Sequence, residues 1–459
     1  MHTYNKTYIL GITLVSAMGG FLFGYDWVVI GGAKPFYERF FDIVPYANLQ
    51  AWAMSSALLG CIVGALFSGI ISTKFGRKIP LIISGSLFLL GSLGTGLAHF
   101  YILFIVFRIL GGIGIGLASA ISPIYIAEVA PSHLRGRLVS VNQLTIVIGI
   151  LTAQIINMLI AEKVPGGASD EFIRLSWNGQ IGWRWMFYAC AIPSGIFLFL
   201  LMFLPESPRW LLKMGNPEKA FPIFKRIGGA EYAIGQSKLI GDSVNNIHGK
   251  SDFKNTLQPK YRKVLMVGLV IAVFQQWSGI NIVFNYAEEI FASAGYGVSD
   301  TLFNIVITGS VNLVFTFIAM LTVDKWGRKK LMLMGSIGLV VTYIFLGFTY
   351  FFGIHGSLTL FFIILGIGIY AMTLAPITWV ILSEIFPNKI RGTAMAIATL
   401  SLWIACFILT YTFPILNKGL GVSGTFWIYA CICMAGFFFI LKKLPETKNK
   451  TLEEIEELI

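Results

Sequence analysis

Long apolar segments recur along the chain, separated by shorter stretches that hold most of the polar residues. The segments are about 20 residues long, the length that an α-helix needs to cross the hydrocarbon core of a bilayer. Strands of a membrane barrel would instead show short segments of alternating polarity. The pattern predicts an all-α integral membrane protein with twelve transmembrane helices, at 8–33, 51–72, 79–99, 102–126, 137–160, 182–204, 264–292, 301–323, 331–353, 358–383, 392–415 and 422–443.

Composition supports this prediction. Hydrophobic residues make up 56% of the 459 residues, charged residues make up 12%, and the mean hydropathy is +0.77. A soluble core could not bury so large an apolar fraction. The predicted spans also leave little room for a soluble domain.

Positive charges are distributed unevenly around the spans. The net charge is +12, and with the N-terminus inside, most Lys and Arg residues fall in cytoplasmic segments. This asymmetry follows the positive-inside rule, so both termini are predicted to be cytoplasmic and no nucleic-acid partner is needed. Only Lys6 precedes the first segment and no small-residue cleavage site follows it, so it is interpreted as a retained span. The outer segments hold Lys34, Arg39, Lys163, Arg174, Arg184 and Lys418.

Two features that resemble binding motifs are better explained by packing. The glycine-rich run GGIGIGLAS at 111–119 follows no strand, so close helix packing is favoured over a phosphate-binding loop. The cysteines lie within spans and lack the spacing of a zinc site, which favours buried, inert thiols. No metal and no cofactor is predicted. The cysteines are Cys61, Cys190, Cys406, Cys431 and Cys433.

Short motifs near the predicted span ends occur twice. STKFGRK, ending at Lys78, returns as TVDKWGRK, ending at Lys329; AEVAPSHLRG at 127–136 returns as SEIFPNKIRG at 383–392; PESP at 205 returns as PETK at 445. The repeat unit is six helices, and two parallel halves with a site between them are typical of transporters. The predicted divisions are a half at 1–204, a cytoplasmic linker at 205–263, a second half at 264–443 and a cytoplasmic tail at 444–459.

Two short cytoplasmic helices are predicted outside the spans. Asn216 followed by Pro217 is typical of a helix start, and the run that follows ends at glycine. In the tail, Thr451 and Glu454 form a capping box. Neither helix shows residues typical of a catalytic site.

One acid, Asp26, interrupts the apolar run GGFLFGYDWVVIGG in the first span, and one base, Arg108, lies within the fourth. Each lies six or seven residues from the predicted outer end of its span, which places both about 10 Å inside the same face. An unpaired acid there costs about 3 kcal/mol, and pairing or protonation relieves that cost. Pairing favours charged Asp26 and separation favours a bound proton, so a proton switch is predicted. A permanent structural ion pair is the alternative.

Amide and aromatic side chains at internal depth indicate a polar cavity. Gly279 is expected to loosen the seventh span between Gln276 and Asn281, whose spacing lets both side chains line one cavity. Hydrogen bonds that only hold helices together are the alternative explanation. The residues are Gln143, Gln275, Gln276, Asn281, Asn312 and Trp379.

Charged residues at the predicted cytoplasmic face suggest a gate. Glu128 and Arg135 flank a Pro-containing turn, as do Glu384 and Arg391 in the second half. Pairs of such charges between two rigid halves could form when the inner side closes and separate when it opens. Solvated charges that only fix the topology are the alternative, worth at most about 1 kcal/mol per exposed pair. Arg77 and Arg328 lie at the same face in neighbouring loops.

The motifs GRK, RGR, PESPRW, QQWSGIN, WGRK, EIFPNKIRG and PETK occur in this order over nearly the whole chain. The chain therefore resembles the sugar porter family of the major facilitator superfamily. The resemblance implies two six-helix halves and a charge network that Glu206 and Glu446 join. It also implies a sugar site at the six amide and tryptophan positions above, lined by Phe23, Tyr286, Tyr370 and Trp403. Proton-coupled members have the Asp of FGYD where facilitative members commonly have Asn.

Three departures from the family bear on which sugar is bound. Asn285 stands where relatives commonly have tyrosine, Leu402 where they have Gln or Asn, and Ala375 where many have glycine. A polar contact to the sugar is therefore missing at Leu402, and Ala375 narrows the cavity.

The expected function is symport of a monosaccharide, a pentose or hexose such as xylose or glucose, with a proton by alternating access. The protein is expected to act as a monomer in the lipid bilayer of a bacterial inner membrane. A facilitative uniporter, in which Asp26 only stabilises the fold, is the main alternative, and a sugar sensor is a second. No pair of nucleophile and base is visible within the spans, so an enzyme is not expected.

Overall fold

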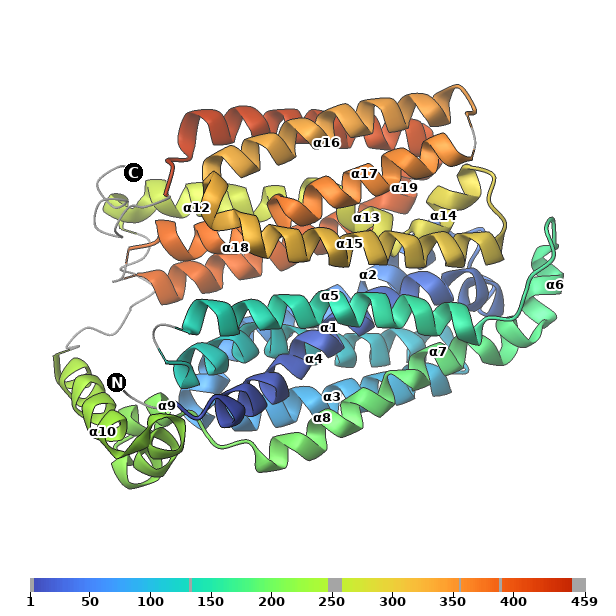
Figure 1. The fold of residues 1–459 in the computed structure, drawn as a ribbon. Helices are drawn as coiled ribbons and strands as arrows, with labels where there is room; N and C mark the ends of the chain where they lie inside the picture. Colours follow the sequence, from blue (N-terminus) through green and yellow to red (C-terminus); the bar gives the residue numbers. More distant parts are fainter. Residues whose placement is uncertain (1–3, 132–133, 247–257, 355, 388–389, 448–459) are drawn as a thin grey trace.

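The computed structural model describes residues 4–131, 134–246, 258–354, 356–387 and 390–447. Within these ranges the secondary structure is helical and no strand occurs, which confirms the all-α prediction. Figure 1 shows two helical bundles, one above the other, with the segments of the N-terminal half below and those of the C-terminal half above. The predicted tail helix at Thr451 and Glu454 lies outside the described residues.

The lower bundle is built from five long helices and a sixth, interrupted span. Asn5 begins the first helix by accepting a hydrogen bond from the backbone N–H of Tyr8 at 3.0 Å. The long helices are α1 (Lys6–Phe40), α2 (Ala47–Phe75), α3 (Lys78–Leu97), α4 (Tyr101–Val129) and α5 (Arg135–Ile160). The sixth span consists of the π-helix η1 (Asn178–Gly182), α7 (Trp183–Ala189) and α8 (Ala191–Phe203), with the short α6 (Asp170–Leu175) before it.

The upper bundle contains two broken spans. The break between α12 and α13 is at Gly279, whose φ of +86° is left-handed, as expected from the sequence. A second break, at Thr373, separates α17 from α18. The helices are α12 (Pro259–Trp277), α13 (Ile280–Asn285), α14 (Ala287–Ser293), α15 (Val298–Trp326), α16 (Arg328–Phe351), α17 (Ser357–Met372), α18 (Leu374–Ile385) and α19 (Arg391–Lys443).

Among the described residues, 11 helical segments are long and apolar enough to span a membrane. The difference from the twelve predicted spans lies in α19, which is 53 residues long and is interrupted at Gly421, where φ is +68°. The predicted spans 392–415 and 422–443 lie on the two sides of this interruption. The helix that contains the first predicted span is longer than the span itself, because α1 continues to Phe40.

The linker between the bundles forms α9 (Pro208–Lys213) and α10 (Pro217–Asn246). The helix predicted after Asn216 is present, and Gly228 and Gly229 interrupt it where its end was expected. The helix α9 is not among the predicted elements, although Ser207 caps it and Pro208 begins it. Figure 1 places α9 and α10 at the left end of the lower bundle.

Close packing explains the glycine-rich run 111–119. A Cβ on Gly112 would lie 1.9 Å from the backbone oxygen of Ala57, and one on Gly116 would lie 2.3 Å from that of Cys61. Only glycine lets α4 approach α2 this closely. The prediction of helix packing is therefore confirmed for this run.

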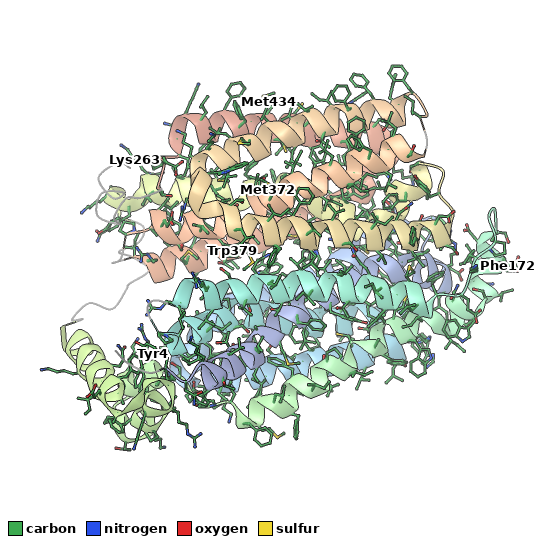
Figure 2. All side chains as sticks on the ribbon, in the orientation of Figure 1. Tyr4, Phe172, Lys263, Met372, Trp379 and Met434 are labelled. Carbon is green, nitrogen blue, oxygen red and sulfur yellow. The ribbon has the colours of Figure 1, made fainter. Side chains whose placement is uncertain are left out.

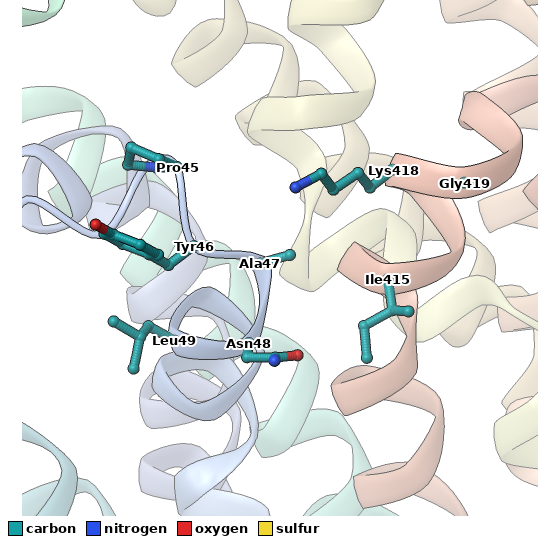
Figure 3. Close-up of a pocket in the computed structure, with 8 residues that line it drawn as sticks. All are labelled: Pro45, Tyr46, Ala47, Asn48, Leu49, Ile415, Lys418 and Gly419. Atoms are coloured by element: carbon teal, nitrogen blue, oxygen red, sulfur yellow. The ribbon is translucent and has the colours of Figure 1, made fainter.

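We call the end of the bundles at which α1 ends and α2 begins the outer end, after the topology predicted from charge, and the opposite end the inner end. Several contacts that join the two bundles lie toward the outer end. Lys34 pairs with Glu288 and Glu289, and the ring of Trp52 packs against those of Phe407 and Tyr411. Beside them, an open cavity of about 530 Å³ lies between the α1–α2 link and α19 (Figure 3).

Candidate functional site

The two charged residues predicted to meet inside the lower bundle do so. Arg108 Nη1 donates a hydrogen bond of 2.9 Å to Asp26 Oδ1, and the residues are 3% and 4% exposed. Asp26 lies farther from the end of its helix than predicted, because α1 extends to Phe40. Arg108 is seven residues from the start of α4, about 10 Å along the helix.

This ion pair is held by one hydrogen bond and is buried. Asp26 Oδ2 and Arg108 Nε are buried and have no hydrogen-bond partner among the described residues. The Arg108 guanidinium also lies 5.6 Å from the centre of the Phe187 ring. A carboxylate oxygen without a donor is able to accept a proton, and a pair held by one bond can separate.

A cavity of about 10 Å³ adjoins Arg108 and is lined by residues from both bundles, including Trp27, Met54 and Asn285. This is about the smallest cavity that can hold one water molecule. The Oδ1 atom of Asn285 is buried without a partner among the described residues. In the sequence, Asn285 is only a departure at the expected sugar site, whereas in the structure it lines the cavity that adjoins Arg108.

The polar residues around the break at Gly279 form a continuous chain. Asn281 Nδ2 donates to Gln276 Oε1, Gln276 Nε2 donates to Gln275 Oε1 at 3.1 Å, and Gln275 Nε2 donates to the backbone oxygen of Ala375 at 3.3 Å. Gln275 and Gln276 are 3% and 7% exposed. The break in the seventh span thus joins amides from α12 and α13 to the start of α18.

An aromatic cluster joins α1 to α19. The ring centre of Trp403 lies 5.6 Å from that of Phe23 and 6.0 Å from that of Trp27. The indole N–H of Trp403 is buried without a partner among the described residues. Trp27 was missed by the sequence analysis, although it directly follows Asp26.

The remaining predicted sugar residues are spread over several helices. Gln143 is on α5 and Asn312 is on α15, two helices that pack against each other across the bundles. Trp379, on α18, lies between that helix and the lower bundle in Figure 2 and is 36% exposed, whereas Tyr370 is buried. The Tyr286 hydroxyl donates to the backbone oxygen of Thr410 at 2.7 Å, so in this conformation it holds α13 against α19.

At the inner end of the lower bundle, Arg77 is bound by two acids. Its Nε and Nη2 atoms donate to the two carboxylate oxygens of Glu128 at 2.8 and 2.7 Å. The backbone N–H groups of Arg77 and Lys78 donate to Glu206, which therefore caps the start of α3. Gly76 has a φ of +85°, and a Cβ there would lie 2.2 Å from Glu206 Oε2.

The upper bundle repeats this arrangement. Arg328 Nη2 donates to Glu384 Oε1 at 3.2 Å, and the backbone N–H groups of Arg328 and Lys329 donate to Glu446 at the start of α16. Gly327, with a φ of +87°, takes the place of Gly76. The two ion pairs of Arg77 and Arg328 each lie within one bundle, so in this conformation they join helices of the same half.

Arg135 and Arg391 cap the turns that they follow. Arg135 Nε donates to the Ala127 oxygen at 3.1 Å, and Arg391 Nε donates to the Phe386 oxygen at 3.0 Å. Arg209, in the linker, lies close to Arg135: burial lowers the pKa of Arg209, the charge of Arg135 lowers this pKa further, and Glu128 opposes the shift. Together, these contacts place the predicted gate residues of both bundles at the inner end of the molecule.

The buried amides and aromatic rings are suited to binding a small polar molecule. Amides and aromatic faces are the groups that recognise hydroxyls and apolar faces of small polar molecules. Within the described ranges, no group of three or more His, Cys, Asp or Glu side chains is placed to hold a metal ion. Four of the five cysteines are buried as predicted, and Cys431 is exposed.

Comparison with known proteins identifies relatives over nearly the full length. The family model described as sugar (and other) transporter matches residues 12–459. The chain is 39% identical to the D-xylose-proton symporter of Escherichia coli (strain K12), with 99% of this chain and 96% of the relative covered. It is 36% identical to the arabinose-proton symporter of Bacillus subtilis (strain 168), with the same coverage.

The fold also matches a solved structure. The xylose transporter XylE from E. coli, in a partially occluded inward open conformation, superposes with a TM-score of 0.85 at 36% identity. The match covers 97% of this chain and 100% of that chain. The two structures therefore agree in the arrangement of the helices over nearly the whole chain.

Proposed function

This chain belongs to the sugar transporter family of the major facilitator superfamily, and on that premise we propose that it moves a monosaccharide together with a proton by alternating access. It is a membrane transporter and not an enzyme. The observation that carries the proposal is the buried Asp26–Arg108 pair, held by one hydrogen bond. The E. coli relative is named for D-xylose and the B. subtilis relative for arabinose, so a pentose is the first candidate and a hexose the second.

Proton coupling follows from the two states open to Asp26. While Arg108 is beside it, the carboxylate is stabilised as an anion. When a conformational change separates the pair, burial of the unpaired carboxyl group favours the protonated acid. The structure has contacts that join the bundles toward its outer end, and a charged, paired Asp26 is the form expected after the proton has left on the inner side.

Sugar binding is assigned to the amide chain at Gly279 and the aromatic groups across from it. Gln275, Gln276 and Asn281 would bridge sugar hydroxyls, as amides do in sites built for neutral polar ligands. Trp379 would stack on the apolar face of the sugar ring. Gln143, Asn312, Phe23, Tyr370 and Trp403 complete the proposed cavity, with Tyr286 able to join it in another conformation.

The inner gate is assigned to the duplicated charge clusters. Arg77, Glu128, Arg135 and Glu206 form the cluster of the lower bundle, and the equivalent residues of the upper bundle are Arg328, Glu384, Arg391 and Glu446. In the present conformation Arg77 and Arg328 hold acids of their own half. When the inner side closes, the two clusters would meet. In the proposed topology, the inner end faces the cytoplasm of a bacterial cell. The protein is proposed to act as a monomer in the inner membrane.

Uptake of a radiolabelled sugar panel into proteoliposomes, with and without an inward proton gradient, tests the proposal. The expected result is that one monosaccharide accumulates only when the gradient is present. Uptake that merely equilibrates the sugar, whatever the gradient, would instead identify a facilitative uniporter. The uniporter is the second candidate because a buried ion pair can also be purely structural.

A further inference from the structure

A second set of buried charges lies at the outer end and is separate from Asp26. Lys34 is 1% exposed, and its Nζ atom lies 3.1 Å from Glu38 Oε2, 3.7 Å from Glu288 Oε2 and 2.6 Å from Glu289 Oε1. Lys34 and Glu38 are on α1, whereas Glu288 and Glu289 are on α14. We call these four residues the outer cluster. It joins the two bundles.

We propose that the outer cluster is a second proton-binding site, at Glu38, and that its protonation favours the conformation closed at the outer end. The proposal does not depend on the role of Asp26. It rests on the balance of charges in the cluster and on the surroundings of Glu38.

The outer cluster contains more acids than it can neutralise. Three carboxylates surround one ammonium group, so the fully ionised cluster would carry two uncompensated negative charges between packed helices. Such a charge is costly away from water unless it is paired or removed by protonation. Uptake of one proton reduces the uncompensated negative charge from two to one.

Among the residues that the structure describes, Lys34 is the cation that forms ion pairs with the three acids of the cluster. The amide of Gln50 donates to Glu38 Oε2 at 3.4 Å, and the amide of Asn417 donates to Glu289 Oε2 at 3.5 Å. The titratable neighbours of Glu38 from the packed helices, besides the cluster itself, include the phenols of Tyr37, Tyr101 and Tyr286. Tyr286 also faces Lys34 and Glu289, and Arg108 faces Tyr37 but is paired with Asp26.

Glu38 is the acid best placed to hold the proton. It is 3% exposed, and its Oε1 atom is buried without a hydrogen-bond partner among the described residues. The side chains of Glu288 and Glu289 are 15% and 18% exposed, so water can solvate their charge in part. A proton on Glu38 Oε1 removes the charge that is most deeply buried and leaves Oε2 to accept from Lys34 and Gln50.

Opening the outer end would move α14 away from α1 and admit water to Glu38. The acid would then ionise more readily, so the closed conformation binds the proton more tightly than the open one. By linkage, a lower external pH favours the closed conformation. A proton affinity ten times higher in the closed state shifts the closed-to-open ratio by about tenfold across the titration.

Distances between two spin labels across the outer pocket test this proposal. Asn48→Cys and Ile415→Cys place labels on opposite bundles at exposed positions lining that pocket (Figure 3). Cys431→Ser removes the exposed native thiol. The full-length protein also carries Asp26→Asn, so that any response to pH arises elsewhere. Lowering the pH from about 8 to about 5.5 is expected to raise the ratio of the short-distance to the long-distance population by about tenfold.

Glu38→Gln mimics the protonated acid and is expected to give the short distance at both pH values. The matched control is Glu171→Gln, an exposed acid of α6 at the outer end, which should respond to pH like the parent. Lys34→Gln leaves three acids without their cation and should reduce the short-distance population at the higher pH. A parent that does not respond to pH, or a Glu38→Gln protein that responds as the parent does, would overturn the proposal.

Discussion

The amides beside Gly279 show how single residues prepare the proposed sugar site. In the structure, Gln276 receives a hydrogen bond from Asn281 and donates one to Gln275. These bonds hold the amides in place without using all their donors and acceptors. A sugar hydroxyl could therefore form hydrogen bonds with these amides without requiring the helices to repack.

Replacing Gln276 with Ala is expected to weaken sugar binding by about 1 to 3 kcal/mol, since the deletion leaves a hydroxyl of the bound sugar unpaired in a buried cavity. Calorimetric titration of the purified variant with the transported sugar measures this loss. Gln180→Ala removes an exposed amide from η1 and serves as the control, with affinity expected to stay unchanged. Equal affinities for the Gln276 variant and the parent would remove this residue from the site.

Gly76 is a residue whose backbone and surroundings both exclude a side chain. Its φ of +85° and ψ of −161° lie in a region occupied essentially by glycine, and Glu206 fills the space where a Cβ would stand. Gly76→Ala is therefore expected to lower stability by about 1 to 3 kcal/mol. Thermal unfolding in detergent measures it, and Gly69→Ala is the control because nothing lies within 4 Å of its added Cβ. Equal melting temperatures for both variants would show that a side chain at position 76 can be accommodated beside Glu206.

At the scale of elements, the broken spans bring the candidate site together. The seventh span breaks at Gly279 and the tenth at Thr373, and Gln275 joins the two regions through the Ala375 oxygen. Transporters commonly bind substrates where spanning helices are interrupted, because freed backbone groups and polar side chains meet there.

The charge clusters connect elements at the inner end. Glu384, which pairs with Arg328 in the present conformation, would meet the cluster of the lower bundle when the inner side closes, so Glu384→Gln is expected to favour the conformation open at the inner end. The pair is partly exposed, so a change of about 1 kcal/mol, or roughly fivefold in the ratio of conformations, is expected. The labelling rate of Trp379→Cys by a thiol reagent added from the inner side measures it. Glu231→Gln, an exposed change on α10, should leave the rate unaltered. If Glu384→Gln leaves it unaltered too, these charges only set topology.

Much of this architecture could be predicted from the sequence, since span length and duplicated motifs carry strong signals. The Asp26–Arg108 pair was predictable because an isolated charge in a span requires a partner. The pairing of Arg77 with Glu128 was not, because two acids and two bases at one face allow several combinations. The outer cluster could not be predicted either: a first span that ends at residue 33 leaves Lys34 and Glu38 outside it, whereas α1 extends to Phe40 and both residues are buried.

At the scale of the whole molecule, two bundles are joined by contacts that can be exchanged. Contacts toward the outer end, including the outer cluster and the rings around Trp52, hold the bundles together in the present conformation. The inner charge clusters remain within their own bundles. Alternating access requires the reverse distribution in the opposite state, with proton and sugar controlling the exchange.

Asp26→Asn tests the central claim most directly, because Asn keeps the size of the side chain and can still accept a hydrogen bond from Arg108, but cannot bind a proton. At a membrane potential of 100 mV, one proton contributes about 2.3 kcal/mol, enough to concentrate sugar roughly fiftyfold. In proteoliposomes, the parent and Asp170→Asn, a change to an exposed acid, should accumulate sugar, whereas Asp26→Asn should only equilibrate it while still binding it. An Asp26→Asn protein that concentrates sugar under the same gradient would contradict the account.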